Sequence, residues 1–315
     1  MTTITLLRTV VIGAINWDIN LFIKAFPRKG EEVAVERITR VPGGKAGNVV
    51  VAAARLLGPK QTAILGGLGK DSIASEHVRI FEEEGVVVSG LMFNPNAESG
   101  QAYIVIDEEG ANIIHTHFGA NATVRPEDLG EPVRHALISE ARVITIMDPL
   151  FETALKLAQD AKRMSKIVAW APGLKSVIGI QKAATMLRNV DYLVTNEFEM
   201  EYLTGKSNPD EAVARLLEVN SKMRMITTLG AKGCSMYSEG ERMTTQALDV
   251  KSLGLSVVNT VGCGDAFIGA FVAAISEGLS NAEALRWGCC AGGLKATRRE
   301  TRGSPSREML LKYLT

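Results

Sequence analysis

Short apolar runs alternate with helical patterns along nearly the whole of this 315-residue chain. The runs have the length and the Val, Ile, Leu and Met content of buried strands, and they occupy residues 10–15, 62–65, 143–147, 167–170, 192–195 and 225–228. Apolar residues recur at the spacing of helices that bury one face at residues 46–57, 72–84, 151–164, 197–203, 210–219, 264–277, 281–297 and 306–314. This alternation predicts an α/β fold, with a mostly parallel central sheet covered by helices on both faces.

Two segments, residues 19–41 and 99–118, break this rhythm. The first contains the sequence Glu31-Glu32-Val33-Ala34-Val35-Glu36. The second contains two runs of alternating polar and apolar residues around an acidic turn that ends in glycine, as hairpins do. Half-buried antiparallel strands outside the parallel sheet predict a small β-sheet lid over its edge. Because the chain shows neither an internal repeat nor a linker rich in Pro and Gly, we predict one domain, residues 1–315, that carries this lid.

Composition and charge narrow the expected partners to small molecules. The 35 basic residues balance 35 acidic ones without a run of Lys or Arg, so the sequence predicts neither a nucleic-acid surface nor a membrane-binding patch. No stretch reaches the roughly 18 apolar residues of a membrane span. The four cysteines form no C-x-x-C pair, which is typical of a reduced, cytoplasmic protein.

A glycine turn near the C-terminus lies between an apolar run and a helix and reads Gly262-Cys263-Gly264-Asp265. Backbone N–H groups at glycines can approach a ligand oxygen closely, and the N-terminus of a helix favours negative charge. The turn therefore predicts an anion site. Asp265 has two interpretations here, a helix cap or a functional group beside a bound anion. In either case the helix N-terminus should lower its pKa.

Two further motifs carry polar groups that suit a ligand. Asn16 and Asp18 come at the end of the first predicted strand, where open α/β sheets bind ligands, and they share one face of it. Such a pair suits a vicinal diol. Gly44, Lys45 and Asn48 begin the first predicted helix, where they offer close backbone approach, a cation and an amide. A polar strand end and a solvated turn are the structural alternatives.

Two motifs follow later strands. Asn196 and Glu199 come directly after the strand at 192–195, where acidic residues in the first turn of a helix are favoured by the helix dipole alone. Thr228, Gly230 and Gly233 form a glycine turn after another strand, and by itself this is only a turn.

Several catalytic motifs are absent from the sequence. It contains no G-x-x-x-x-G-K-[ST] P-loop, no complete G-x-G-x-x-G dinucleotide fingerprint and no G-x-S-x-G nucleophile motif. The sequence therefore favours neither a P-loop enzyme, nor a dehydrogenase, nor a serine hydrolase.

Taken together, the chain resembles the ribokinase family of carbohydrate and nucleoside kinases, often called the PfkB family. The resemblance runs nearly from end to end, through four motifs in the family's order at residues 13–18, 43–48, 195–199 and 259–265. It implies a three-layer α-β-α ribokinase-like fold with a mostly parallel central sheet and a β lid. It also implies a kinase that uses ATP and Mg²⁺.

The resemblance assigns roles residue by residue. Asp265 matches the catalytic base, and the backbone of Gly262, Cys263 and Gly264 matches the anion hole for the transferred phosphoryl group. Contacts to sugar hydroxyls are implied for Asn16, Asp18, Gly44, Lys45, Asn48 and Asp148. Nucleotide contacts are implied for Asn196, Thr228, Gly230, Gly233 and Gly292, and an indirect magnesium and phosphate contact for Glu199.

Two positions depart from the family pattern. The last motif begins with Asn259, where family members commonly carry an Asp that helps to bind a monovalent cation, so we do not assume potassium activation. Residues 298–306 do not align cleanly with the usual Gly-Ala-containing loop, and we assign no cation ligand there.

The sequence leaves the acceptor open. A ribose-like free sugar fits Asn16, Asp18 and Asp148. The apolar neighbours Phe118, Met147 and Phe151 could instead cover the base of a nucleoside such as adenosine, inosine or cytidine. A sugar phosphate is favoured less, since the motifs supply a single cation. ADP as donor and a non-catalytic sensor are further alternatives. Exposed lid strands also predict a homodimer through the lids.

Overall fold

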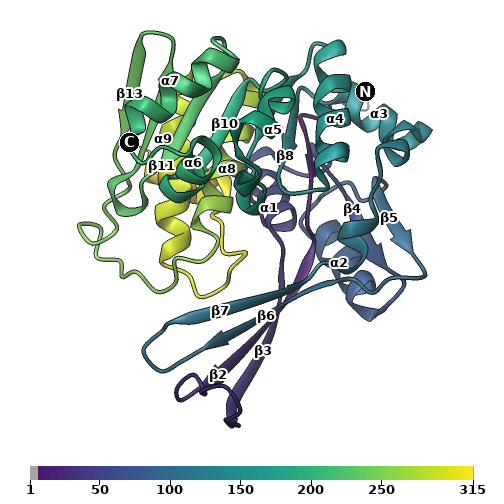
Figure 1. Cartoon of the computed structure of the whole chain (residues 1–315), viewed down its shortest axis with the longest axis vertical. Helices are drawn as coiled ribbons and strands as arrows, with labels where there is room; N and C mark the ends of the chain where they lie inside the picture. Colours follow the sequence, from purple (N-terminus) through teal and green to yellow (C-terminus); the bar gives the residue numbers. More distant parts are fainter. Residues whose placement is uncertain (1–5, 315) are drawn as a thin grey trace.

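The structure, a computed structural model, describes residues 6–314 and contains two sheets (Figure 1). The larger sheet has nine strands in the spatial order β13-β12-β11-β10-β9-β8-β1-β4-β5. Their bounds are β1 Thr9–Ile12, β4 Thr62–Gly69, β5 Leu91–Asn94, β8 Val143–Ile146, β9 Ile167–Trp170, β10 Tyr192–Asn196, β11 Arg224–Thr228, β12 Cys234–Ser238 and β13 Glu241–Thr245. All neighbours from β11 to β5 are parallel, and β12 and β13 at one edge are antiparallel, so the sheet is mostly parallel as predicted.

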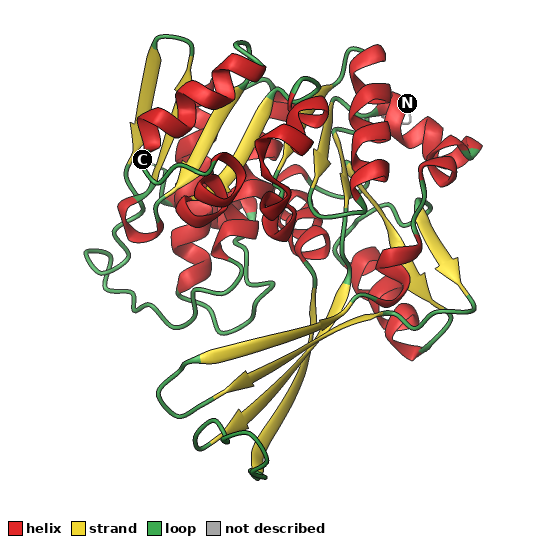
Figure 2. Cartoon of the chain, viewed as in Figure 1, coloured by secondary structure: helices red, strands yellow, loops and turns green. Residues whose placement is uncertain are grey.

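Helices cover both faces of this sheet (Figure 2). The face that carries the first buried apolar cluster has α1 Lys45–Leu57, α2 Ser72–Glu83, α8 Cys263–Glu277, α9 Asn281–Ala296 and α10 Arg307–Lys312. The opposite face carries a second cluster, with α3 Pro132–Glu140, α4 Phe151–Arg163, α5 Gly179–Leu187, α6 Glu197–Thr204 and α7 Pro209–Val219. The short 3-10 helices are η1 Gly119–Thr123, η2 Pro126–Gly130, η3 Gly173–Ile178 and η4 Gly230–Lys232. The three α-β-α layers expected from the sequence are therefore confirmed.

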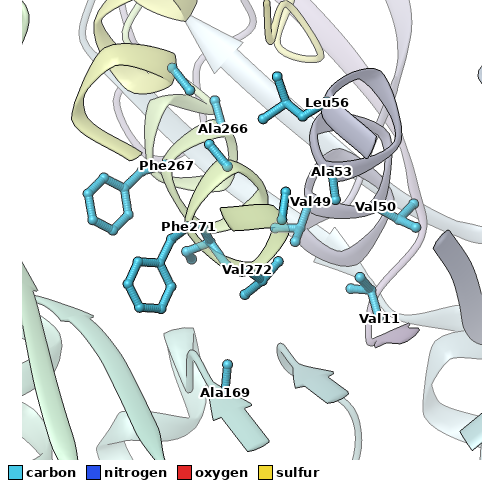
Figure 3. Close-up of a cluster of buried hydrophobic side chains, with 14 of the residues drawn as sticks. Val11, Val49, Val50, Ala53, Leu56, Ala169, Ala266, Phe267, Phe271 and Val272 are labelled. Carbon is cyan, nitrogen blue, oxygen red and sulfur yellow. The ribbon is translucent and has the colours of Figure 1, made fainter. Parts of the chain in front are cut away.

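Helices α1 and α8 pack against each other over the sheet. Figure 3 shows Val49 and Ala53 of α1 beside Phe271 and Val272 of α8, near Val11 of β1. All five side chains are fully buried, and burial of a side chain of Val or Phe size contributes about 1.5–3 kcal/mol. This contact fixes the two helices relative to each other, and with them the residues of their first turns.

The smaller sheet is the β-sheet lid, and it projects from the body (Figure 1). Its strands, in spatial order, are β3 Val35–Gly43, β2 Asn16–Ile23, β6 Gly100–Ile106 and β7 Asn112–His117. The two outer pairs are antiparallel as expected, but the central pair β2–β6 is parallel. The reason is that β2 and β6 leave the body in the same direction, and each pairs with its own return strand.

The clearest difference from the sequence-based boundaries is at the first strand. The apolar run at 10–15 predicts one strand, but β1 ends at Ile12 and the chain crosses into the lid at Asn16. Residues 13–15 remain buried during this crossing, which is why they read as a continuation of the strand. Among residues 6–314, none of the helices combines the length and the apolarity that crossing a bilayer requires.

Candidate active site

Three segments that are far apart in the sequence meet at the N-terminal end of α8. Asp265 lies in the first turn of this helix, and its Oδ2 accepts a hydrogen bond of 2.8 Å from Nδ2 of Asn48 in α1. Oδ1 of Asn48 in turn accepts a hydrogen bond of 3.1 Å from Nε of Arg302. These two bonds fix the orientation of the Asn48 amide, because its oxygen faces a donor and its nitrogen faces an acceptor.

The surroundings raise the pKa of Asp265 to about 6. Desolvation of the carboxylate is the main cause and Asp148 adds to it, while the hydrogen bond from Asn48 and the charges of Lys45 and Arg302 oppose it. The expectation of a lowered pKa is therefore wrong, because loss of water outweighs the helix dipole here. A carboxylate with this pKa is mostly ionised at neutral pH and still accepts a proton, as a general base must.

The first residues of the lid approach this site. Asn16 and Asp18 belong to β2, and not to the end of a main-sheet strand as predicted, since β1 ends before them. Both are buried, with 9% and 7% of their surface exposed. Asp18 lies directly against Gly43, where an added Cβ atom would come within 2.2 Å of the carboxylate. A glycine at this position therefore lets the lid strand approach the start of α1.

Burial also raises the pKa of Asp18, to about 7. The guanidinium of Arg302 lowers this pKa and the carboxylate of Asp265 raises it, so the three groups act on one another electrostatically. On the other face of β2, Trp17 packs edge-on against the His77 ring at 5.2 Å between centroids, as the alternation of a strand requires. Asp18 is thus a buried carboxylate that a ligand hydroxyl could satisfy.

Asn121, in η1, holds the chain where it enters the lid. Its Nδ2 donates to Oδ1 of Asn16 at 2.9 Å and to the carbonyl of Ile15 at 3.1 Å, and its Oδ1 accepts from the Ile15 N–H at 2.9 Å. Asp148 lies beside the same crossing, where its Oδ1 accepts from the N–H of Ala14 at 3.0 Å. Asn121 was not among the predicted site residues, since no motif surrounds it in the sequence.

Asn196 and Thr228 are neighbours at the carboxyl ends of β10 and β11, where they are register partners. Asn196 and Glu199 accept hydrogen bonds from each other's backbone N–H groups at the start of α6, a capping box that stabilises the helix by itself. Oε1 of Glu199 lies 3.9 Å from Nζ of Lys45, so an ion pair connects the start of α6 with the start of α1.

The predicted site glycines of α8, α9 and the η4 turn differ in how closely other atoms approach them. At Gly262, φ is 85° and an added Cβ atom would lie 2.4 Å from the carbonyl oxygen of Thr301, so other residues are strained there. A Cβ atom added at Gly264 would have no neighbour within 4 Å, so there is free space beside the turn at this residue. Three other predicted nucleotide residues lie in α9 and around η4, namely Gly292, Gly230 and Gly233. Their roles stay predictions.

Arg302 is the charged residue of this site that the sequence-based analysis missed. It is 7% exposed, its Nη2 donates to the carbonyl of Gly43 at 2.8 Å, and its guanidinium carbon lies 5.2 Å from the centroid of the Phe81 ring. Nη1 is buried and has no hydrogen-bond partner among the described residues. Gly47 in α1 makes room for this guanidinium, because a Cβ atom at that position would come within 2.5 Å of Nη2 of Arg302.

Comparison with known proteins identifies the class of this protein. The profile of the "pfkB family carbohydrate kinase" matches residues 7–308. The chain therefore belongs to the pfkB family of carbohydrate kinases, and it is a phosphotransferase that acts on a sugar hydroxyl.

Several ribokinases are similar to it over nearly their whole length. The ribokinase of Lactococcus lactis subsp. lactis is 30% identical over 288 residues, which cover 90% of this chain and 89% of that protein. The structure of Thermotoga maritima ribokinase is 28% identical, covers 98% of this chain and 99% of its own, and has a TM-score of 0.85. That of Arabidopsis thaliana ribokinase is 26% identical, with the same coverage and a TM-score of 0.87.

Proposed function

We propose that this kinase transfers the γ-phosphoryl group of ATP to a hydroxyl of a ribose-like sugar, with Asp265 as the catalytic base. The observation that carries the proposal is the Asp265 carboxylate, which Asn48 holds in place and which has a pKa of about 6. The buried polar residues Asn16 and Asp18 lie at the base of the lid, and the carboxylate of Asp265 acts electrostatically on that of Asp18. The similar Arabidopsis thaliana ribokinase was solved with ribose and ATP, which supports this choice of substrates.

The chemistry follows from the arrangement of the carboxylate. Oδ2 of Asp265 accepts the hydrogen bond from Asn48, which leaves Oδ1 to accept the proton of the sugar hydroxyl. Because the transition state of phosphoryl transfer is loose, the hydroxyl loses its proton late, and the carboxylate first orients the nucleophile. The N–H of Cys263 donates to the carbonyl of Thr260 at 3.2 Å, so the other backbone N–H groups at residues 262–265 take up charge on the phosphoryl group. A closed lid keeps water away from ATP.

In this proposal Asn196 and Glu199 support a magnesium ion indirectly. Carboxylate and amide oxygens suit Mg²⁺, which commonly keeps several of its waters, and Oε1 of Glu199 has Lys45 as a charged neighbour at 3.9 Å. Bound Mg²⁺ would neutralise charge on the phosphates. Among the described residues, no three or more His, Cys, Asp or Glu side chains cluster as a metal site.

The proposal includes a homodimer through the lids. The lid face opposite Asp18 carries an apolar row across all four strands, formed by Ile38, Leu21, Val105 and Ile113. Ile38 and Ile113 are 45% and 47% exposed. Leu21, Val105 and Ile113 line a hollow with a volume of about 350 Å³. An exposed apolar sheet face of this kind suits a second copy of the same lid.

A coupled assay of nucleotide consumption tests the function. Purified protein is given ATP or ADP with ribose, fructose, adenosine, inosine, cytidine or ribose 1-phosphate, and product is followed by mass. We expect the highest kcat/KM with ATP and ribose. A higher value for a nucleoside would replace the sugar with that acceptor, and no turnover on any acceptor would favour a sensor that binds without catalysis.

A further inference from the structure

Lys295 is a fully buried lysine close to the proposed anion hole. It lies in the last turn of α9 with 0% of its surface exposed, and its Nζ donates to the main-chain carbonyl of Asn259 at 2.9 Å. A lysine near the end of a helix is often stabilising through the helix dipole, but such a lysine normally keeps its ammonium in water. Burial of an ammonium group is costly unless it is paired, so this contact calls for an explanation.

Three polar atoms of Asn259 pair with the end of α9 and the chain beyond it, and the fourth, Oδ1, pairs within its own segment. Its backbone N–H donates to the carbonyl of Ala296 at 3.1 Å, and its Nδ2 donates to the carbonyl of Arg299 at 2.8 Å. Its Oδ1 accepts from the N–H of Val261 at 3.0 Å. Together with the bond from Lys295, these contacts hold the start of the segment that leads to residues 262–265.

The ammonium also places a positive charge close enough to Cys263 and Asp265 to act on them electrostatically. Burial lowers the pKa of Lys295, and the nearby acidic groups of Cys263, Glu300 and Asp265 oppose that effect. Asp265 and Cys263 belong to the first turn of α8, so the charge of Lys295 acts at the place where a phosphoryl group would gather negative charge.

The residues present do not fit the monovalent cation that the family resemblance implies. A potassium ion in a protein takes oxygen ligands that replace its water shell. In this chain the amide of Asn259 stands where family members commonly carry the carboxylate of an Asp. The side-chain Oδ1 and the main-chain carbonyl of Asn259 both already accept N–H donors. The carbonyl of Arg299 accepts a third donor, the Asn259 amide itself. Nitrogen donors thus already occupy both oxygens of Asn259, the residue of the cation motif that this chain retains as an amide.

We propose that Lys295 is a positioning residue whose ammonium takes the place of a monovalent cation, so that this kinase needs neither potassium nor sodium. The inference rests on the proposed function of residues 262–265 as the anion hole. The lysine fixes the Asn259 carbonyl and supplies a positive charge from the chain itself, the two things that a bound ion would otherwise provide.

The first test needs no variant. Turnover and ADP affinity of the wild-type protein are measured in potassium, sodium and tetramethylammonium chloride at about 0.1 M, so that screening is equal. We expect the three salts to agree within about twofold, well below the roughly 5–150-fold range of real coupling between sites. Activation or tighter ADP binding by more than about fivefold in potassium overturns the proposal.

The second test removes the ammonium. Lys295→Met keeps the length of the side chain but loses one charge-assisted hydrogen bond, and we expect kcat to fall about 10–100-fold in tetramethylammonium chloride. In Lys295→Ala, which leaves space, potassium or ammonium ions should restore part of the loss. Lys182→Met, which removes an exposed lysine of α5, is the matched control and should behave as wild type.

The two tests separate failure of this inference from failure of the proposed function. ADP binding and thermal unfolding in the three salts need no sugar, so they report on Lys295 even when no acceptor is phosphorylated. A folded Lys295→Met protein with wild-type turnover and ADP affinity in every salt contradicts the positioning role. If that variant does not fold, the ion response of the wild type still decides.

Discussion

The two sides of the proposed site are built differently. On the body side, Asp265, Asn48 and Arg302 come from separate segments and are joined by side-chain hydrogen bonds. On the lid side, Asn16 and Asp18 lie at the root of a projecting sheet whose outer strands are largely exposed. We infer that the body orients the reacting groups before the substrate binds, and that the lid residues contribute to binding of the substrate. We therefore expect changes on the body side to lower kcat and changes at the lid root to raise KM.

The largest effect should come from Asp265→Asn on the body side. Asparagine keeps the shape of the side chain but cannot accept the hydroxyl proton, so kcat should fall by about 10²–10⁴-fold. ADP affinity and the unfolding temperature should stay close to those of the wild type. Asp210→Asn, an exposed position in the first turn of α7, is the matched control. Near-normal turnover in Asp265→Asn would remove this residue from the base role.

Arg302 tests whether the linked side chains act as a unit. Arg302→Met removes the hydrogen bond to Asn48 and the buried charge, and we expect kcat to fall about 10–100-fold. The charge of Arg302 lowers the pKa of Asp265, so that pKa should rise above about 6 without it. Since a base works when it is deprotonated, the acidic limb of the kcat profile should move to higher pH.

Two variants distinguish orientation from charge at this position. Arg302→Lys keeps the charge without the fork geometry that reaches both Asn48 and Gly43, so its kcat should fall while the acidic limb stays near that of the wild type. Arg299→Met, on the exposed stretch nearby, is the control. A loss in Arg302→Met with an unmoved pH profile would mean that the residue has a structural role alone.

At the lid root, Asp18→Asn should act on binding. Loss of a charged acceptor for sugar hydroxyls should raise KM by about tenfold with a smaller change in kcat, the opposite pattern to Asp265→Asn. Equal losses in kcat and in kcat/KM would break the distinction between the two sides. Steady-state kinetics with varied sugar concentration measures the split.

The same substitution should stabilise the free protein at high pH. The folded state raises the pKa of Asp18 from 3.8 to about 7, so it binds this proton more tightly than the unfolded state does. Wild-type stability should therefore decline as pH rises from about 4 to about 7, and Asp18→Asn removes that decline. Thermal unfolding at pH 5 and pH 8 checks this, with a larger gain expected at pH 8. A larger gain at pH 5 would contradict the raised pKa.

What the sequence could predict depended on whether neighbours in space were neighbours in the chain. The layers and the lid follow from hydrophobic periodicity, and Asp265 and Asn48 stand in short motifs at helix starts, where local geometry decides their position. Arg302, Lys295 and Asn121 stand in no such motif, because the contacts that position them are made with segments far away in the sequence.

Two wrong expectations have the same origin. The pKa of Asp265 was expected to fall because a helix dipole can be read from sequence, whereas the desolvation that raises it cannot. Residues 10–15 were predicted to form one strand because a buried crossing between two sheets is as apolar as a strand. In both cases the sequence pattern does not show how deeply segments far away in the chain bury the residues.

The smallest effect on catalysis should come from changes on the lid face opposite Asp18, where we propose that two copies of the chain meet. Ile113→Lys places a charge in the apolar row, and Ile114→Lys places the same charge on the opposite face of β7. Both positions are exposed, at 47% and 57%, so neither change disturbs the core. If the faces opposite Asp18 pair, desolvation of the lysine opposes dimer formation at residue 113 but not at residue 114. Light scattering at micromolar concentration should then find dimers for the wild type and for Ile114→Lys, and monomers for Ile113→Lys. A monomeric wild type would exclude pairing through the lids at that concentration.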